Sequence, residues 1–453
     1  MPSHRDPRGV ASTLRIGWFT AACVLVSNII GGGIFTTTGF LARDVGDPIL
    51  ILSLWSLGAL VALAGAMAYA ELGATYPHAG GDYLYLREAY GPLPAFLSGW
   101  TSFTIGFGAS IAASSVSFAS YLLRAVPLEE EHRVVETGLA LGLIWGLTAV
   151  HATGVAAGGL LQRLLTTAKV TALGLLILGG FFFGNGTWDH LSVRSMPADV
   201  GPGSTAVAFI FVMYCYLGWN VVGYIAGEIA EPAKTLPRIM IGGTAFVAAI
   251  YLLLNLLYLY ALPVTQLAEP PILPVAEKAA AALWGPTAGR WLALLLALSI
   301  AGGVSAMMWA GPRVYWVMAK DGIVSPWLAV LHASSVVPVR AMLLQAVWAS
   351  VLIITGTFEQ LVVYSGIVLA AFMVLTIGAV IRLRHRAPDQ PRPYRVPFYP
   401  WLPGILMIGA MALVGNSAVQ RPVESLLGLA TVLAGLPLYY IWRKPLRARS
   451  ISH

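Results

Sequence analysis

Long uninterrupted apolar runs are the feature that most constrains what this chain can fold into. Runs of roughly 18 or more residues with few charges have the length that an α-helix needs to cross a bilayer. Of the 453 residues, 58% are hydrophobic and only 10% are charged, with a mean hydropathy of +0.77. A soluble domain has about 25% charged residues, so this chain lacks the polar surface that a water-soluble globule of its size needs. The sequence therefore predicts an all-α polytopic protein embedded in a lipid bilayer.

Twelve segments fit this description. The predicted spans are 15–42, 48–74, 91–123, 133–155, 160–184, 204–227, 238–262, 288–317, 338–356, 360–382, 401–419 and 423–442. The third is long enough to require a strongly tilted helix. Residues 275–283 follow three closely spaced prolines and are too few and too charged to cross, so they are predicted as a surface helix between spans seven and eight.

The distribution of Lys and Arg sets the orientation, because cytoplasmic loops carry the excess of these residues. With the N-terminus inside, 19 of the 27 Lys and Arg residues lie in the cytoplasm and 7 lie outside, which leaves Lys169 within a span. The tails 1–14 and 443–453 are then both cytoplasmic, in a cell (inner or plasma) membrane, and the acidic run 129–131 lies outside. The net charge of +7 is spread thinly between apolar segments, whereas a nucleic-acid-binding protein concentrates basic residues on one face. No nucleic-acid partner is expected.

Two spans carry an interruption near their centre. In span one, Gly31, Gly32 and Gly33 follow one another, which weakens the helix and leaves its backbone bare. Close helix packing is the alternative explanation for such small residues. In span six, Gly218 and Asn220 interrupt an aromatic-rich stretch.

The two interruptions occupy corresponding places in two halves of similar length. Spans one to five cover 15–184 and spans six to ten cover 204–386, with 401–442 forming two additional spans. A matched pair of interrupted helices is typical of an inverted-repeat transporter with its site at the bilayer midplane. Unwound backbone is tolerated at that depth only where it lines a cavity or is buried in protein. The sequence therefore predicts a five-plus-five inverted repeat with helices 1 and 6 broken at the midplane.

Broken helices predict the chemistry of the cavity. The half-helix that starts near Gly33 would direct free N–H groups and a positive dipole end at a carboxylate. The half-helices that end near Asn28 and Tyr214 would leave unpaired carbonyls, which suit an ammonium group. A site that offers both kinds of group suits a zwitterion, and so an α-amino acid.

The motifs around these interruptions resemble the amino acid–polyamine–organocation superfamily, most closely its L-type amino acid transporter family. The resemblance covers nearly the whole chain, although Gly32 stands where serine is usual. The matching residues are Gly31 to Gly33 with Ile34 and Phe35; Glu71, Pro77, Gly80, Gly81, Tyr83, Tyr85 and Gly91; Gly218, Trp219, Asn220, Glu228, Glu231, Pro232, Leu236, Pro237 and Arg238; and Arg313, Asp321, Gly322, Pro326 and the run 392–397. The resemblance implies a secondary transporter, an exchanger or facilitator, of neutral L-amino acids that works by alternating access. It implies neither an enzyme nor a cofactor or metal site.

The resemblance also implies roles for individual residues. Within the Gly31, Gly32 and Gly33 run, the last two would donate N–H groups to the carboxylate, and Ile29 would accept from the ammonium. The backbone acceptors of span six would be those of Tyr214, Cys215 and Leu217, and the Tyr214 ring would form a lid. Leu217 stands where glycine is frequent and Ala370 where some large-substrate relatives carry tryptophan, so the size of the substrate side chain stays open.

Lys169 is the one cation in the middle of a span. An intramembrane charge is costly and is by default a functional hypothesis. The alternative is snorkelling, although about five residues separate Lys169 from the end of span five near Arg163, which permits only a partial escape to the interface. In the resembling family, a lysine here replaces the ion of sodium-coupled relatives and touches the broken first helix. Transport independent of sodium is expected, and proton coupling stays open because a buried lysine can change its charge.

Carboxylates are missing from the interrupted parts of spans one and six, and from the middle of spans three, eight and ten. A cationic substrate would need such a countercharge, so neutral amino acids are favoured over a cationic amino acid or polyamine antiporter.

Glu71 and His151 are expected at the membrane interface. No metal-binding or protease motif points to an intramembrane enzyme, while a non-transporting nutrient sensor stays open. Animal L-type relatives pair with a glycoprotein through a cysteine after span three, and residues 124–133 contain none, so no disulfide-linked heavy chain is expected.

Overall fold

The computed structural model describes residues 15–125, 132–195, 201–270, 274–356, 358–420 and 422–442. The predicted tails 1–14 and 443–453 and the acidic run 129–131 lie outside these residues. Within them, the regular structure is helical apart from one isolated parallel bridge between Ile16 and Ile229. The prediction of an all-α chain is confirmed for the described residues.

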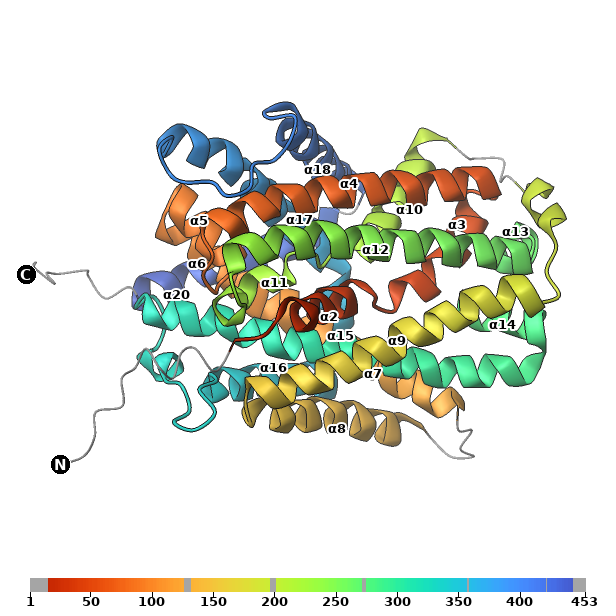
Figure 1. Ribbon diagram of the computed structural model, residues 1–453, viewed down its shortest axis with the longest axis horizontal. Coiled ribbons are helices and arrows are strands. Elements are labelled where there is room, and N and C mark those ends of the chain that lie inside the picture. The colour runs from red at the N-terminus through yellow and green to blue at the C-terminus, as the bar shows by residue number, and fades with distance from the viewer. Residues whose placement is uncertain are drawn as a thin grey trace, which may run out of the picture.

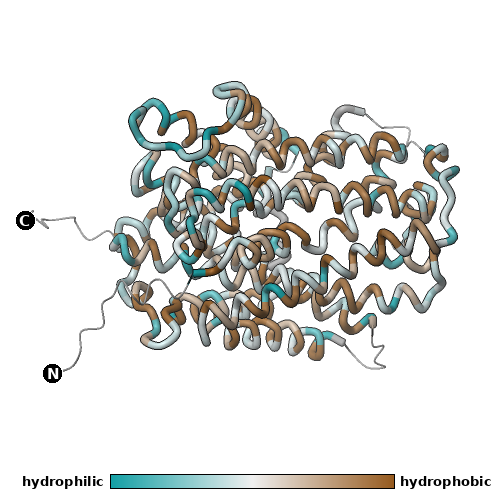
Figure 2. Tube along the Cα trace, in the orientation of Figure 1, coloured by the Kyte–Doolittle hydropathy of each residue, from teal (hydrophilic) through white to brown (hydrophobic). Residues whose placement is uncertain are grey.

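Long helices lie side by side along the molecule (Figure 1). Nine helical segments of the described chain are long and apolar enough to cross a membrane. These segments belong to α4 (Pro48–Thr75), α6 with α7 (Pro92–Thr101 and Gly108–Ala125), α8 (His132–Ala152), α9 (Val155–Phe183), α12 (Pro232–Ala261), α15 (Pro286–Lys320), α17 (Phe358–Arg386), α18 (Trp401–Gln420), and α19 with α20 (Pro422–Leu433 and Gly435–Trp442). Three shorter apolar segments lie in α2 (Trp18–Ile29), α10 (Pro202–Tyr216) and α16 (Val339–Thr355). Hydrophobic residues follow the helices, and hydrophilic ones gather at the ends and in the connecting loops (Figure 2).

Short helices mark the two ends of the bundle (Figure 1). The α5 end carries α5 (Asp82–Tyr90) and α20, and the α14 end carries α3 (Thr37–Asp44), α13 (Val264–Ala268) and α14 (Val275–Trp284). The remaining short elements are the turns η1 (Gly33–Phe35), η3 (Trp188–Ser192), η4 (Ala226–Glu228) and η5 (Pro326–Ala329), the π-helical turn η2 (Ser102–Phe107), and the single-turn helix α11 (Val221–Tyr224). The helix predicted at 275–283 is present as α14.

Several predicted helix boundaries are wrong. Helix α9 begins at Val155 rather than at 160, and α12 begins at Pro232 rather than at 238 with Pro237 inside it. Helix α12 continues through Lys234 and Thr235, ahead of the apolar stretch that the prediction followed, and α9 continues through the small residues Ala156 to Gly159. The last predicted span, 423–442, matches the segment Pro422–Trp442, with one turn between α19 and α20.

The third predicted span is one continuous helical segment, but it contains the π-helical turn η2 between α6 and α7. A π turn adds a residue to a helical turn and is frequent at functional sites. The apolar pattern of 91–123 gave no sign of it.

Glu71 lies four residues before the end of α4, and His151 lies one residue before the end of α8. Both side chains are buried by neighbouring helices. Glu71 is 2% exposed, and its carboxylate accepts from the Arg384 guanidinium (Nη2, 2.5 Å) and the Val396 N–H (2.7 Å). His151 Nε2 lies 2.9 Å from Ser305 Oγ. The sequence placed both near helix ends, but α17 and α15 cover them.

Replacing Glu71 with glutamine is expected to lower the stability of the folded protein. Removing one partner of a buried ion pair costs about 3–5 kcal/mol, because the Arg384 charge is left without its carboxylate. Thermal unfolding of the purified variant measures this loss. Glu231→Gln is the control, since Glu231 and Lys234 form an ion pair with both side chains 70% exposed. Equal unfolding temperatures for the two variants would contradict the prediction.

Candidate functional site

The first helix break lies between α2 and α3. Helix α2 ends at Ile29, and Ile30 leaves the helical conformation with ψ at 82°. The turn η1 follows, and α3 begins at Thr37. The N–H groups of Gly32 and Gly33 donate to no acceptor in the described part of the chain. These two donors are available to a ligand.

The second break lies between α10 and α11. Helix α10 ends at Tyr216, and Leu217 is extended with ψ at 151°. Gly218 has a φ of +119°, a conformation that L side chains rarely adopt. A Cβ at this position would also lie 2.6 Å from Asn28 Nδ2. Glycine is therefore required by the backbone and by the contact with the first break.

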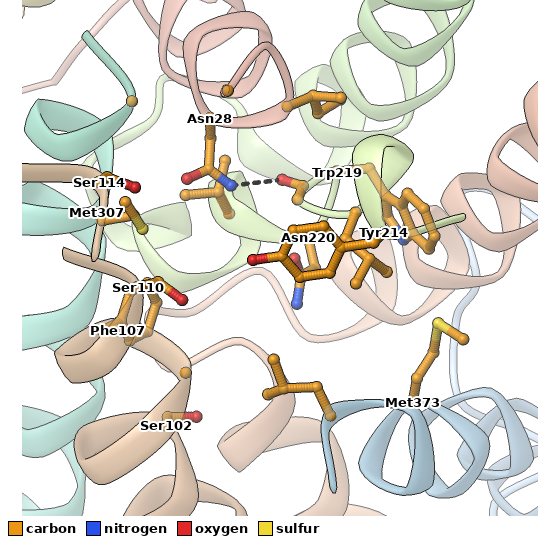
Figure 3. A pocket seen from close by; sticks show the side chains of 18 of the residues that line it. Asn28, Ser102, Phe107, Ser110, Ser114, Tyr214, Trp219, Asn220, Met307 and Met373 are labelled. Carbon is orange, nitrogen blue, oxygen red and sulfur yellow. Dashed lines mark hydrogen bonds between the residues drawn. The ribbon is translucent and has the colours of Figure 1, made fainter. Parts of the chain in front are cut away.

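Three side-chain contacts join the two breaks. The Asn28 amide donates from Nδ2 to the Gly218 carbonyl at 3.1 Å (Figure 3). The Tyr251 hydroxyl, which comes from α12, lies 2.7 Å from the Ile29 carbonyl and 3.1 Å from that of Cys215. Cys215 Sγ lies 3.1 Å from Thr37 Oγ1. No sequence pattern marks Tyr251 as a residue of the site.

A cavity of about 260 Å³ lies at the two breaks. Its lining contains every residue predicted to contact substrate, namely Ile29, Gly31, Gly32, Gly33, Tyr214, Cys215 and Leu217. The Tyr214 side chain is 47% exposed and its ring lies across the cavity (Figure 3). Ile29 and Cys215 are buried, and contribute mainly backbone.

The three glycines of the first break differ in their surroundings. A Cβ added to Gly31 would meet no atom within 4 Å, and one added to Gly32 would be 4.0 Å from Ile300. At Gly33, the added atom would lie 2.7 Å from Cys215 Sγ. Gly31 and Gly32 therefore border open space, whereas Gly33 also permits close packing of the two breaks.

Most of the cavity wall that faces the two helix breaks was not predicted from the sequence. It comes from η2, α7, α15 and α17, and the lining side chains include Ser102, Phe107, Ser110, Ser114, Met307, Leu369, Phe372 and Met373 (Figure 3). Ala370, singled out in the sequence, is not among the lining residues; its neighbour Leu369 is. The π turn explains part of this wall, since it shifts the register of the residues that follow.

The cavity also contains a carboxylate, which comes from outside the interrupted spans. Asp82, at the start of α5, is 7% exposed and lines the cavity. Its Oδ2 accepts from Asn220 Nδ2 at 2.8 Å and from the Tyr224 hydroxyl. The sequence placed Asp82 between spans, and the turn at Gly80 and Gly81 folds it back against α11.

Lys169 lies behind the cavity, at the middle of α9, fourteen residues from Val155 and fourteen from Phe183. It is 1% exposed. The predicted distance of about five residues to a helix end is wrong, because α9 begins at Val155. Burial of the ammonium against protein acceptors excludes snorkelling. Its Nζ donates to the Ile30 carbonyl at 2.7 Å and lies 3.1 Å from both the carbonyl and the hydroxyl of Ser27. The lysine therefore binds the end of α2 directly.

Charged contacts connect the second break to the α5 end. Glu228, after α11, accepts from Arg313 Nε and Trp309 Nε1, each at 2.8 Å. Farther out, Asp321 accepts from the Tyr83 hydroxyl at 2.5 Å and pairs with Arg87. Burial, reinforced by the neighbouring Asp321 carboxylate, raises the pKa of Tyr83, so its hydroxyl remains a donor. Among the described residues, no group of three or more metal-ligating side chains comes together.

Comparison with known proteins identifies the family. Residues 16–436 match the model of the amino acid permease family. The chain is 30% identical to the serine/threonine exchanger SteT of Bacillus subtilis (strain 168), with 97% of this chain and 99% of the relative covered. It is 28% identical to the Homo sapiens large neutral amino acids transporter small subunit 2 (96% and 81% covered). It is 27% identical to the b(0,+)-type amino acid transporter 1 of Mus musculus (94% and 87% covered). The chain belongs to the amino acid permease family, within the amino acid–polyamine–organocation superfamily, and is a multi-pass membrane protein.

Proposed function

We propose that this chain is a secondary transporter of neutral L-amino acids that works by alternating access, as an exchanger or a facilitator, without sodium. The observation that carries the proposal is one cavity bounded by both helix breaks. Such a cavity offers backbone donors from one break and backbone acceptors from the other.

The backbone of the breaks supports a site for a zwitterion. The N–H groups of Gly32 and Gly33 donate to no protein acceptor, and a helix start attracts a carboxylate. The α-ammonium group would be accepted by the carbonyls of Ile29, Tyr214, Cys215 and Leu217. Two of these carbonyls already accept from Tyr251, but a carbonyl has two lone pairs and can accept a second hydrogen bond. Tyr251 would then hold the ammonium acceptors in place.

The Tyr214 ring is proposed as the lid over the substrate. Its side chain lines the cavity and is 47% exposed, so it has room to move. Tyr214 also comes shortly before the unwound residues Leu217 and Gly218 in the chain. The backbone can rotate at these two residues without breaking helical hydrogen bonds.

Lys169 supports transport without sodium. Its ammonium occupies the carbonyls of Ser27 and Ile30, which are the oxygen ligands that a metal cation would need at the end of α2. While it is protonated, this ammonium also repels a second cation.

Two alternatives remain to be tested against neutral exchange. Asp82 in the cavity provides the countercharge that a cationic amino acid or polyamine would need, and a buried Lys169 is a site at which proton coupling can arise. Two relatives are named for neutral substrates, one for large neutral amino acids and one for serine and threonine, and these names favour the neutral assignment.

The proposed architecture has twelve spans. The first repeat is 15–184, the second is 204–386, and 401–442 forms two additional spans. Three shorter apolar helices beside nine long segments, and helix breaks in α2–α3 and α10–α11, support this division. The excess of Lys and Arg supports cytoplasmic tails in a cell membrane. Cys23 and Cys215 are both buried, which supports function without a disulfide-linked heavy chain.

Uptake by proteoliposomes tests the proposal. The purified chain is expected to take up one radiolabelled neutral amino acid, and unlabelled neutral amino acids should compete while arginine and polyamines do not. Competition by arginine at least as strong as that by any neutral amino acid would contradict the neutral assignment. Absence of uptake by correctly inserted protein would favour a sensor.

Replacing sodium with choline is expected to leave the initial rate of uptake unchanged, because the Lys169 ammonium takes the place of a bound ion. The measurement is radiolabelled uptake at equal osmolarity, without any other change in the medium. Collapse of uptake in choline would refute the assignment of Lys169.

Gly33→Val is expected to abolish substrate binding, because a branched side chain at this position obstructs the approach to the bare N–H groups. The same side chain also meets Cys215 Sγ, so the double variant Gly33→Val with Cys215→Ala is the control that relieves the clash. Equilibrium binding to each purified variant is measured. Recovery of affinity in the double variant would show that Gly33 serves packing and not the site.

A further inference from the structure

A closed triangle of hydrogen bonds lies at the wall of the cavity. The Asn220 amide donates from Nδ2 to Asp82 Oδ2 at 2.8 Å and to the Tyr224 hydroxyl oxygen at 3.2 Å. The Tyr224 hydroxyl in turn donates its one hydrogen to the same Asp82 oxygen. Asp82 is 7% exposed and Tyr224 is 6% exposed, so the triangle is almost sealed from water.

The triangle fixes which way the Asn220 amide points. An ionised carboxylate only accepts hydrogen bonds, so the group that faces Asp82 must be the NH₂ of the amide. Both Nδ2 hydrogens are donated to Asp82 and Tyr224, and the amide oxygen then points away from this triangle. Asn220 lines the cavity (Figure 3), and its Oδ1 has no hydrogen-bond partner among the described residues while not being sealed from solvent. The oxygen is thus an acceptor that the protein leaves free.

Asn28, on the other break, is oriented in the same sense. Its Nδ2 donates to the Gly218 carbonyl, and its oxygen points away from that bond into the cavity (Figure 3). Both amides of the cavity therefore present oxygen, which favours a ligand group that donates. The backbone acceptors proposed for the α-ammonium precede Gly218, whereas Asn220 follows it, so Asn220 faces another part of the substrate.

We propose that Asp82 is a positioning residue that holds the Asn220 amide with its oxygen toward the cavity, and that the site thereby selects amino acids whose side chain carries a hydrogen-bond donor. This inference rests on the proposed function and narrows its substrate class. Valine-like apolar side chains fit the same volume but leave the Asn220 oxygen unpaired, which costs affinity.

Constitutional isomers give the sharpest test. Homoserine and O-methylserine contain the same atoms, but only homoserine carries a side-chain donor; norvaline is the apolar analogue of similar length. Each competes against a radiolabelled substrate in proteoliposomes. In the wild-type protein, homoserine is expected to bind about tenfold more tightly than O-methylserine, as for one additional hydrogen bond.

The variants separate positioning from folding. Asp82→Ala releases the amide to rotate, and the ratio of the two isomers is expected to approach one, while competition by norvaline reports that the cavity still forms. Asp82→Asn keeps an oxygen that accepts from Asn220, so most of the ratio should return. Asp47→Asn is the matched control, since Asp47 is 8% exposed and caps α4 away from the cavity, and it should retain the wild-type ratio. If Asp82→Ala does not fold, the ratio in Tyr224→Phe, which removes the second acceptor of the amide, is measured in its place and should fall.

A wild-type ratio near one overturns the inference, as does a full ratio in Asp82→Ala with norvaline still competing. Failure of all three neutral amino acids to compete in the wild-type protein contradicts the proposed function itself. The two failures are therefore distinguishable.

Discussion

The ammonium of Lys169 at the end of α2 is the interaction on which the site depends. A helix that stops inside a membrane protein leaves carbonyls without partners, and each such buried group costs about 1–3 kcal/mol if it stays unpaired. Lys169 donates to two of these carbonyls and to the Ser27 hydroxyl. The break in α2 can persist at this depth because a charge from α9 satisfies it. The same contacts supply the acceptors that a lysine buried to this degree needs.

Once the carbonyls at the helix breaks have hydrogen-bond donors, other side chains can hold the two breaks together. Asn28 and Tyr251 tie the first break to the second, so the donors of one and the acceptors of the other face a common cavity. Glu228 and Arg313 then connect the second break to α15. A rearrangement of either broken helix would have to exchange these contacts, so in the proposed transporter they would couple a bound ligand to a change of the whole bundle.

Sequence reasoning located the breaks but not the opposite wall. Glycine runs and the interrupted aromatic stretch mark unwound backbone directly, and so Gly31 to Gly33 and Leu217 were found at the cavity. Asp82 was missed because hydropathy places it in a loop, and only the turn at Gly80 and Gly81 returns it to α11. The π turn in the third segment and the contact from Tyr251 depend on tertiary packing, which leaves no periodic trace. Lys169 was recognised, but its distance from the helix end was underestimated because α9 begins at Val155, ahead of the predicted start at 160.

Lys169→Ala, compared with the wild-type protein in both transport and binding, tests the central claim most directly. Losing a charge-assisted hydrogen bond to the end of α2 costs about 1.5–3 kcal/mol, or roughly a 10- to 150-fold shift between conformations. The account predicts a large loss of uptake with substrate binding partly retained, because no proposed substrate contact has been removed. Lys234→Ala, at an exposed lysine, is the control and should transport normally. Wild-type uptake by Lys169→Ala would show that the break in α2 does not depend on this charge.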